Sequence, residues 1–321
     1  SFKHLFFQMT TFFHSFQPHA VLEVAGEDAG EYLQSQFSAD LAESPENLAA
    51  HGLWLSRKGK VEGDGFVLRE DEENFFIVSY HCPSVALEKK IMANVIADDV
   101  EIADQTSFNK GLSIWGGGTE KVLAQLNLPC PSPGAWEENE NIKVFEGRRA
   151  KGRGFDLIGK TAEIDSLAKN LNPLLEETGV QELDEIEAHF ARIEAGIPAI
   201  PDEIGQNELP QEGFLEKKSV SFTKGCFLGQ EVMARLRSMG GVQRKLWAVE
   251  ILEKGLSTPA EIFVGDRMAG FLKTRYSKAD KEIGAALIKI SSLQRALEEG
   301  LSTKPNTTPN IQLLHEFSFQ G

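Results

Sequence analysis

Residues 224–235 read KGCFLGQEVMAR and form the most informative stretch of this 321-residue chain. The run places a thiol, a carboxylate, an amide and two cations within about three helical turns. Gly225 permits a tight turn and residues 227–236 are good helix formers, so we expect a glycine turn that feeds a helix. Cys226 would then lie near a helix N-terminus with Lys224 beside it, and both features favour a thiolate. The alternative is that Cys226 is a small buried apolar residue.

The composition is that of an ordinary soluble globular protein, with 41% apolar and 25% charged residues. A chain of this length predicts two or three domains. The formal net charge of −15 argues against a nucleic-acid partner, because phosphate contacts need a basic surface. A local basic pocket for a small anion is still compatible with it. The cations between Lys217 and Lys245 form either such an island or a solvated surface strip.

The three cysteines are scattered along the chain, at Cys82, Cys130 and Cys226. None belongs to a C-x-x-C pair or is spaced with histidine as a metal site requires, so we predict no metal site in this chain alone. Scattered thiols fit a reducing compartment, and no run reaches the length of a membrane span. We therefore expect a cytoplasmic protein without a membrane partner, and an organelle matrix is equally compatible.

The hydrophobic patterns mix hairpins and helices without a regular strand–helix alternation, which favours an α+β fold over a doubly wound sheet. Residues 66–78 read as a hairpin, and apolar residues within 183–197 recur three and four apart as in a core-facing helix. After Gly240, short strands separated by Gly, Pro and Asp turns indicate a small β-barrel. The polar tail from Thr303 is expected to be partly disordered. Residues 116–118 read as a flexible connection, because they lack the lysine of a phosphate-binding loop.

The pattern K-G-C-[aromatic]-x-G-Q-E-x-x-x-R, which continues into residues 240–247, resembles the signature of the YgfZ-type folate-binding proteins. These are relatives of the glycine-cleavage T-protein, an aminomethyltransferase, and are linked to iron–sulfur cluster assembly and repair. Further matching segments follow in order between about Val21 and Ile290, which covers most of the chain. They are residues 24–36, the R-K-G-K turn at 57–60, and residues 99–104 and 192–198.

This resemblance implies a T-protein-like folate-binding core of two interleaved α/β subdomains in residues 1–240, a small C-terminal β-barrel in residues 241–300 and a tail in residues 301–321. It implies tetrahydrofolate, or a one-carbon derivative of it, as the cofactor, and iron–sulfur enzymes or cluster-assembly proteins as partners. Whether the chain turns over a substrate stays open. One alternative is a folate-dependent aminomethyl or one-carbon transferase of the T-protein branch. Another is a regulatory folate sensor with an inert thiol.

A reduced folate makes three physical demands on a site. The N–H donors of the pterin edge pair with a carboxylate, and the flat ring packs against an aromatic or apolar wall. The glutamate tail pairs with Arg or Lys. Glu194, at the R-x-E-x-G position of the family, is the candidate pterin carboxylate, or else a solvated helix residue. Asp64 resembles the acid at the G-K-x-x-x-D position, near which the aminomethyltransferases keep a working aspartate, or else caps its own turn. Gly63 and Gly65 depart from the paired acids of the transferases, which puts methyl transfer in doubt but not binding.

The remaining candidates surround the cysteine motif. We predict that Cys226 and Asp64 carry the chemistry and that Glu194 binds folate together with Lys224, Gln230, Arg235, Arg244 and Trp247. The two arginines would meet the folate tail, and the tryptophan is either a core residue or a pocket wall. The transferase reaction needs no thiol, because a carboxylate and positioning suffice. A thiolate instead suits transient persulfide, sulfenate, disulfide or iron contact, so the cysteine separates the two branches.

Overall fold

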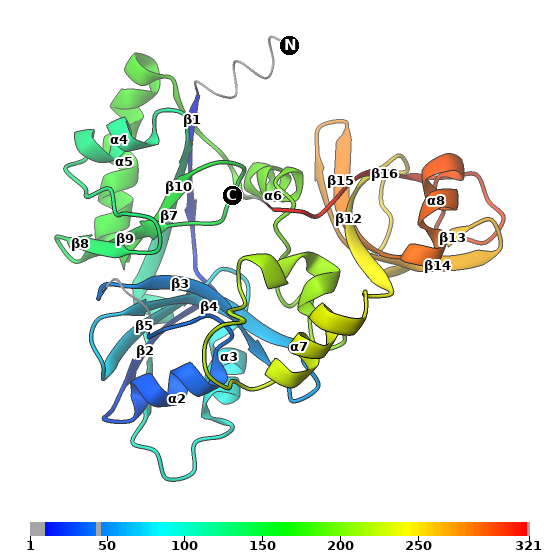
Figure 1. Cartoon of the computed structure of the whole chain (residues 1–321). Helices are drawn as coiled ribbons and strands as arrows, with labels where there is room; N and C mark the ends of the chain where they lie inside the picture. The colour runs from blue at the N-terminus through cyan, green and yellow to red at the C-terminus, as the bar shows by residue number, and fades with distance from the viewer. Residues whose placement is uncertain (1–9, 43–45, 320–321) are drawn as a thin grey trace.

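The computed structural model describes residues 10–42 and 46–319, with the side chains of residues 172–178 and 239 left out of the description. In these ranges the chain forms three β-sheets, with helices on their outer faces and between them (Figure 1). This mixed architecture confirms the predicted α+β class. No helix within the described ranges is both long and apolar enough to span a membrane.

The first sheet contains, in spatial order, β11 (Val180–Glu182), β1 (Thr11–Phe16), β7 (Asn109–Gly116), β10 (Gly154–Lys160), β9 (Ile142–Glu146) and β8 (Trp136–Asn139). β11 pairs parallel with β1, and the other pairings are antiparallel. Two helices cover its outer face, α4 (Thr119–Gln125) and α5 (Thr161–Thr178). Their buried Leu123 and Ile164 join the core formed by Leu112 and Leu157 of the sheet.

The second sheet contains, in spatial order, β3 (Ala49–Leu55), β4 (Val61–Arg69), β5 (Asn74–Ser79), β2 (Ala20–Ala25) and β6 (Glu101–Asp104). The predicted hairpin at residues 66–78 is confirmed as the antiparallel pair β4–β5. Two helices cover the outer face, α2 (Ala29–Gln36) and α3 (Ser84–Met92). The chain enters the first sheet with β1, builds the second with β2–β6 and returns with β7, so the two sheets are interleaved.

The third sheet contains β13 (Ala260–Val264), β14 (Arg267–Lys278), β15 (Lys281–Lys289), β12 (Arg244–Ile251) and β16 (Ile311–Glu316), with α8 (Ile290–Glu299) packed against it. All of its pairings are antiparallel. Single bridges join Leu301 to Ile311 and Ser302 to Phe263, so this short segment links the two edge strands. The sheet therefore curls toward the closed form that a small barrel has.

The predicted disorder of the tail is wrong for residues 311–316, which form β16. Ile311 and Leu313 are buried in the core of the third sheet, whereas Gln312 and Leu314 between them are exposed. This period-two alternation is the pattern of a half-buried strand, and the polar residues before it had concealed the pattern.

The centre of the molecule holds η2 (Pro210–Gly213), η3 (Leu215–Lys217), α6 (Glu185–Glu194) and α7 (Gln230–Met239), which lie between the three sheets (Figure 1). One apolar cluster here draws Leu53 from the second sheet, Ile193 from α6, Met233 from α7 and Leu287 from the third sheet. Because each part contributes to the same core, the parts are packed against one another rather than strung on linkers.

A buried ion pair crosses this junction. Arg192 of α6 donates from Nη1 and Nη2 to the two carboxylate oxygens of Glu203, both at 2.8 Å, and the side chains are 3% and 0% exposed. Glu203 also accepts from the backbone N–H of Ala199 at 2.7 Å and from the hydroxyl of Thr274 in β14. The carboxylate thus ties α6 and the following loop to the third sheet.

We expect Glu203→Gln to lower the free energy of unfolding by about 3 kcal/mol, because it leaves the Arg192 guanidinium buried without its countercharge. Urea unfolding of both proteins measures the difference. Asp280→Asn is the matched control, since Asp280 pairs with Lys254 in full solvent and should cost less than about 1 kcal/mol. Equal effects of the two substitutions would contradict the role given to the buried pair.

Candidate functional site

Three buried polar side chains connect the first and second sheets. Nε2 of His51, in β3, lies 3.1 Å from Oδ2 of Asp64 in β4. Arg148, which follows β9, places Nη1 at 2.5 Å from Nδ1 of the same ring. A guanidinium can only donate, so Nδ1 accepts and the ring proton resides on Nε2, from which it is donated to Asp64. The order of donation is therefore Arg148 to His51 to Asp64.

His51, the middle member of this hydrogen-bonded series, is neutral at neutral pH. Burial, and secondly the charge of Arg148, lower the pKa of His51 to about 4. Its contact with Asp64 is then a hydrogen bond and not an ion pair. The second oxygen of Asp64 accepts from the hydroxyl of Ser79 at 3.4 Å. The carboxylate and the guanidinium thus balance each other across an uncharged ring.

A cavity of about 610 Å³ is lined in part by Arg148, and we call it the larger cavity. Phe66 and Phe319 supply aromatic walls, and the guanidinium of Arg148 lies 5.1 Å from the Phe319 ring. Lys218 adds positive charge at its wall, whereas Arg153 is paired with Glu146 of the same wall and with Glu120. Its volume and its mixture of flat apolar walls with a few charged groups are those of a site for a small organic molecule.

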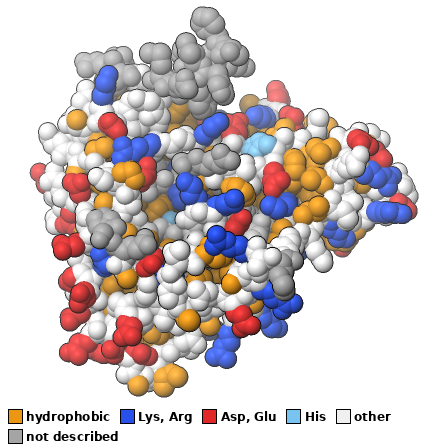
Figure 2. Space-filling view, viewed as in Figure 1, with side chains coloured by type: hydrophobic (Ala, Val, Ile, Leu, Met, Phe, Trp, Pro, Cys, Tyr) orange, Lys and Arg blue, Asp and Glu red, His pale blue; other side chains and the backbone are white. Residues whose placement is uncertain are grey.

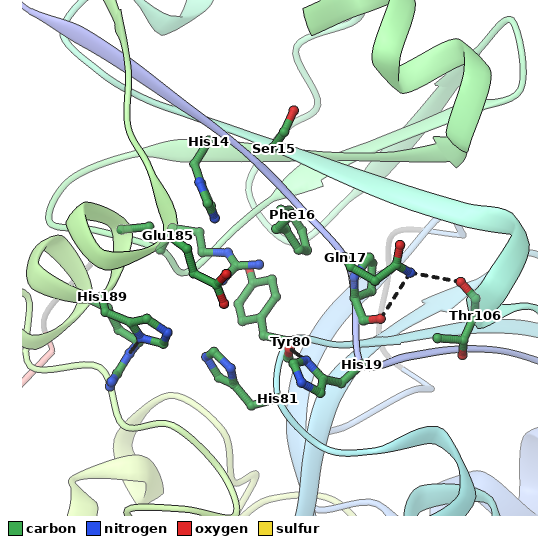
Figure 3. A pocket seen from close by; sticks show the side chains of 14 residues that line it. His14, Ser15, Phe16, Gln17, His19, Tyr80, His81, Thr106, Glu185 and His189 are labelled. Atoms are coloured by element: carbon green, nitrogen blue, oxygen red, sulfur yellow. Dashed lines mark hydrogen bonds between the residues drawn. The ribbon is translucent and has the colours of Figure 1, made fainter. Parts of the chain in front are cut away.

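A second cavity of about 340 Å³ is lined by His14, His19, His81 and His189, and we call it the histidine-lined cavity. Figure 3 shows that these rings come from β1 and the residues after it, from the end of β5 and from α6. The two cavities share no lining residue. A gap of about 10 Å³ beside Asp64 shares lining residues with both of them.

The structure places Cys226 in an exposed turn. The predicted helix start at Phe227 is wrong, because α7 begins at Gln230 after Gly229, whose φ of 88° ends the turn. Cys226 therefore lies three residues before the N-cap, Gly229. It lines none of the cavities described above.

Lys224, a predicted folate ligand, contacts protein groups in this structure. Its ammonium donates to the backbone oxygens of Gln34, Phe37 and Ala39 at 2.7 to 2.8 Å and to Oε1 of Gln34 at 3.1 Å. These carbonyls lie at the C-terminal end of α2, where a cation offsets the negative end of the helix dipole. Burial lowers the pKa of Lys224 to about 8. Lys224 therefore fastens the cysteine turn to α2.

Four further predicted folate ligands lie outside the cavities. Arg244 donates from Nε and Nη2 to the buried carboxylate of Glu212, at 2.7 and 3.1 Å, so its fork is already occupied. Trp247 packs against the core of the third sheet. Arg235 is exposed on α7, and Gln230 lies 3.5 Å from the backbone oxygen of Gly225. The sequence motif is thus largely a structural unit that carries an exposed cysteine.

Glu194 is the last residue of α6 and lies away from both cavities. Its side chain is 54% exposed and pairs with Lys281 at 3.5 Å. The helix turns Ala188, Arg192 and Ile193 toward the core, and Glu194 follows about 100° further around the axis. Asp64 is the predicted site residue that the structure places beside a cavity, in contact with His51 and Arg148, which the sequence analysis did not single out.

Charge is distributed unevenly on the face shown in Figure 2. Acidic side chains gather at the lower left over the second sheet and α2, whereas Lys and Arg gather near the centre and around α7. Of the cations between Lys217 and Lys245, Arg235 and Arg237 are exposed on α7, whereas Arg244 and Lys245 pair with Glu212 and Glu316.

Comparison with known proteins agrees with this architecture. Residues 16–133 match the family model described as the GCVT N-terminal domain. The "tRNA-modifying protein YgfZ" of Shigella boydii serotype 4 (strain Sb227) is 27% identical over 242 residues, which are 71% of this chain and 68% of that protein. An aminomethyltransferase of Thermoanaerobacter pseudethanolicus is 24% identical over 298 residues, covering 88% of this chain and 80% of its own.

The fold has a close counterpart among solved structures. The crystal structure of the glycine cleavage system aminomethyltransferase T from Bartonella henselae superposes with a TM-score of 0.78. The superposition covers 99% of this chain and 88% of that chain at 16% identity, and it confirms the predicted T-protein-like fold. The sequence and structure comparisons thus agree that the chain is similar to the protein named YgfZ and to the aminomethyltransferases.

The lowered pKa of His51 makes folding sensitive to acid. Below about pH 6.5 the ring takes up a proton in the unfolded chain, whereas in the folded protein it stays neutral down to about pH 4. Its contribution to stability is complete above pH ~6.5 and is lost as the pH falls toward ~4. We expect His51→Gln to reduce the loss in unfolding free energy between about pH 7 and about pH 5 by about 2 kcal/mol.

Urea unfolding at the two pH values measures this change. His315→Gln is the control, because His315 lies in β16, away from the cluster around Asp64. An identical pH dependence in wild-type protein and His51→Gln would contradict the neutral, buried state of the ring.

Proposed function

We propose that this protein binds tetrahydrofolate, or a one-carbon derivative of it, in the larger cavity and assists the assembly or repair of iron–sulfur clusters. One observation carries the binding proposal. Arg148 lines a cavity that has two phenylalanine walls, and it also lines the gap beside a buried acid, Asp64, which is hydrogen-bonded to His51. The family resemblance supplies the identity of the ligand.

The cavity meets the three demands of a reduced folate. Phe66 and Phe319 offer flat walls for the pterin or the aminobenzoyl ring. Lys218 supplies positive charge for the glutamate tail. At the inner end, Arg148 lines both the cavity and the gap beside Asp64. A pterin edge that reaches past Arg148 would donate to the carboxylate.

Support for the iron–sulfur role comes from the cysteine turn and from the relatives named YgfZ. The Lys224 ammonium fixes this turn against α2, so Cys226 is held at a defined, solvent-accessible position. An exposed thiol on a rigid turn suits brief contact with a sulfur or iron atom carried by a partner protein. Cys226 is then the functional thiol, and the folate site lies elsewhere on the molecule.

The folate proposal is tested by calorimetric titration with tetrahydrofolate. We expect wild-type protein to bind, and Asp64→Asn to weaken binding by about 1 to 3 kcal/mol, the cost of losing a buried charged acceptor. Glu194→Ala should bind like wild type, because Glu194 is exposed and paired with Lys281. A loss of affinity in Glu194→Ala with none in Asp64→Asn would contradict the placement of the pterin.

The thiol proposal is tested in cells that lack the native protein, by the activity of an iron–sulfur enzyme. We expect Cys226→Ser to lose function and Cys130→Ser to keep it, since both cysteines are exposed but only Cys226 belongs to the motif. Tetrahydrofolate affinity should be unchanged in both variants. Full function in Cys226→Ser would favour a folate sensor with an inert thiol.

The second candidate function is aminomethyl transfer to tetrahydrofolate. Its support is the aminomethyltransferase fold together with a carboxylate, Asp64, beside the cavity. Against it, Gly63 stands where transferases tend to carry the first of two paired acids, and Gly65 follows Asp64. Turnover of an aminomethylated carrier protein with tetrahydrofolate, abolished by Asp64→Asn, would decide for this candidate.

A further inference from the structure

A short segment between Ser219 and Lys224 connects the proposed folate site to the cysteine turn. Ser219 is fully buried, and its hydroxyl oxygen lies 2.8 Å from Nδ1 of His51 and 3.0 Å from Nη1 of Arg148. Lys224, at the other end, is 7% exposed and anchors the cysteine turn. Seven positions along the chain therefore separate a contact of the proposed folate site from the thiol of Cys226.

Ser38 holds both ends of this segment. Its hydroxyl donates to the backbone oxygen of Ser219 at 2.5 Å, and its own backbone oxygen accepts from the N–H of Ser221 at 2.8 Å. The backbone oxygens of the two residues that flank it accept from the Lys224 ammonium at 2.8 and 2.7 Å. The side chain of Ser38 is fully buried. A path of hydrogen bonds and short backbone steps thus crosses the interior from the proposed folate site to the cysteine turn.

The end of this path at His51 has two possible arrangements. Nδ1 of the ring has one lone pair, but both Arg148 and Ser219 can donate to it. Nη1 of Arg148 carries two N–H bonds, so it can donate to Nδ1 and to the Ser219 oxygen together. When the guanidinium turns to a ligand, the Ser219 hydroxyl can donate to Nδ1 in its place. The ring proton stays on Nε2 in both arrangements, so the hydrogen bond to Asp64 is kept.

The exchange changes how firmly the segment is held. The imidazole ring of His51 has few rotatable bonds and is fixed by Asp64, whereas an arginine side chain has many. A hydroxyl that donates to the ring is therefore held more tightly than one that accepts from Arg148. Hydrogen-bond networks with two discrete arrangements can couple distant sites.

We propose that Ser219 is a positioning residue that couples the larger cavity to the cysteine turn. A ligand that engages Arg148 transfers the hydrogen bond at His51 Nδ1 to the Ser219 hydroxyl. The tightened segment then restricts the turn and makes the thiol of Cys226 less accessible. The inference rests on the proposed function, and it gives that function a physical link between the folate and the thiol.

The test measures alkylation of Cys226 by iodoacetamide, with every variant made in Cys130→Ser protein. The remaining cysteine, Cys82, is buried. We expect saturating tetrahydrofolate, at a concentration set by calorimetry, to slow alkylation about fivefold, the lower end of common coupling factors. Ser219→Ala lacks the hydroxyl that replaces Arg148, so tetrahydrofolate should leave its alkylation rate unchanged.

Two further variants sharpen the test. Thr223→Ala is the matched control, because Thr223 lies in the same segment but is exposed, with its hydroxyl 3.3 Å from that of Ser221. It should keep the full slowing by tetrahydrofolate. Arg148→Met removes the competing donor, so the Ser219 hydroxyl donates to His51 without a ligand. This variant should be alkylated about fivefold more slowly than its parent in the absence of tetrahydrofolate.

The outcomes separate the coupling from folate binding itself. If calorimetry detects no tetrahydrofolate binding, the folate proposal fails, and the Arg148→Met rate without ligand still decides the coupling. If Arg148→Met does not fold, the comparison of Ser219→Ala with its parent decides. An unchanged rate in folded Arg148→Met would overturn the coupling. So would bound tetrahydrofolate that fails to slow alkylation of the parent, or that slows Ser219→Ala equally.

Discussion

The hydrogen bond from Arg148 to Nδ1 of His51 is the contact on which the proposed site depends. It fixes the tautomer of the ring, and so it determines that the proton on Nε2 points at Asp64. It also brings the positive charge of the first sheet to the negative charge of the second. Without it, the guanidinium of Arg148 and the carboxylate of Asp64 would no longer be connected through the ring.

Arg148 and Arg149 are consecutive in the sequence but line different cavities. Arg148 lines the larger cavity and the gap beside Asp64, whereas Arg149 lines the histidine-lined cavity. The first guanidinium is held by the hydrogen bonds that it makes to protein groups, and the second is held by ring stacking with its N–H edge left unpartnered. Two consecutive residues therefore line two different cavities.

Sequence patterns predicted the parts of this fold whose signal is local. The β4–β5 hairpin and the helix near residues 183–197 follow from hydrophobic periodicity, and the family resemblance identified Asp64. His51 and Arg148 carried no comparable signal, because they are 97 positions apart and meet only after the two sheets pack. The four histidines of the second cavity are scattered in the same way.

The misplaced predictions have physical reasons of their own. The motif around Cys226 suggested a thiol activated by Lys224, but the long lysine side chain reaches the carbonyls at the end of α2 instead. The hydrophobic periodicity predicted the helix that carries Glu194. Ile193 of this helix is buried, however, and the next residue, Glu194, is exposed. In both cases the local element was easier to predict than the direction of one side chain.

The most direct test of the central claim is a crystal structure of the protein with tetrahydrofolate bound. The account predicts density in the larger cavity, with the pterin edge within hydrogen-bonding distance of Asp64 and the glutamate tail near Lys218. Density that contacts Glu194, or that occupies the histidine-lined cavity while the larger cavity stays empty, would contradict it.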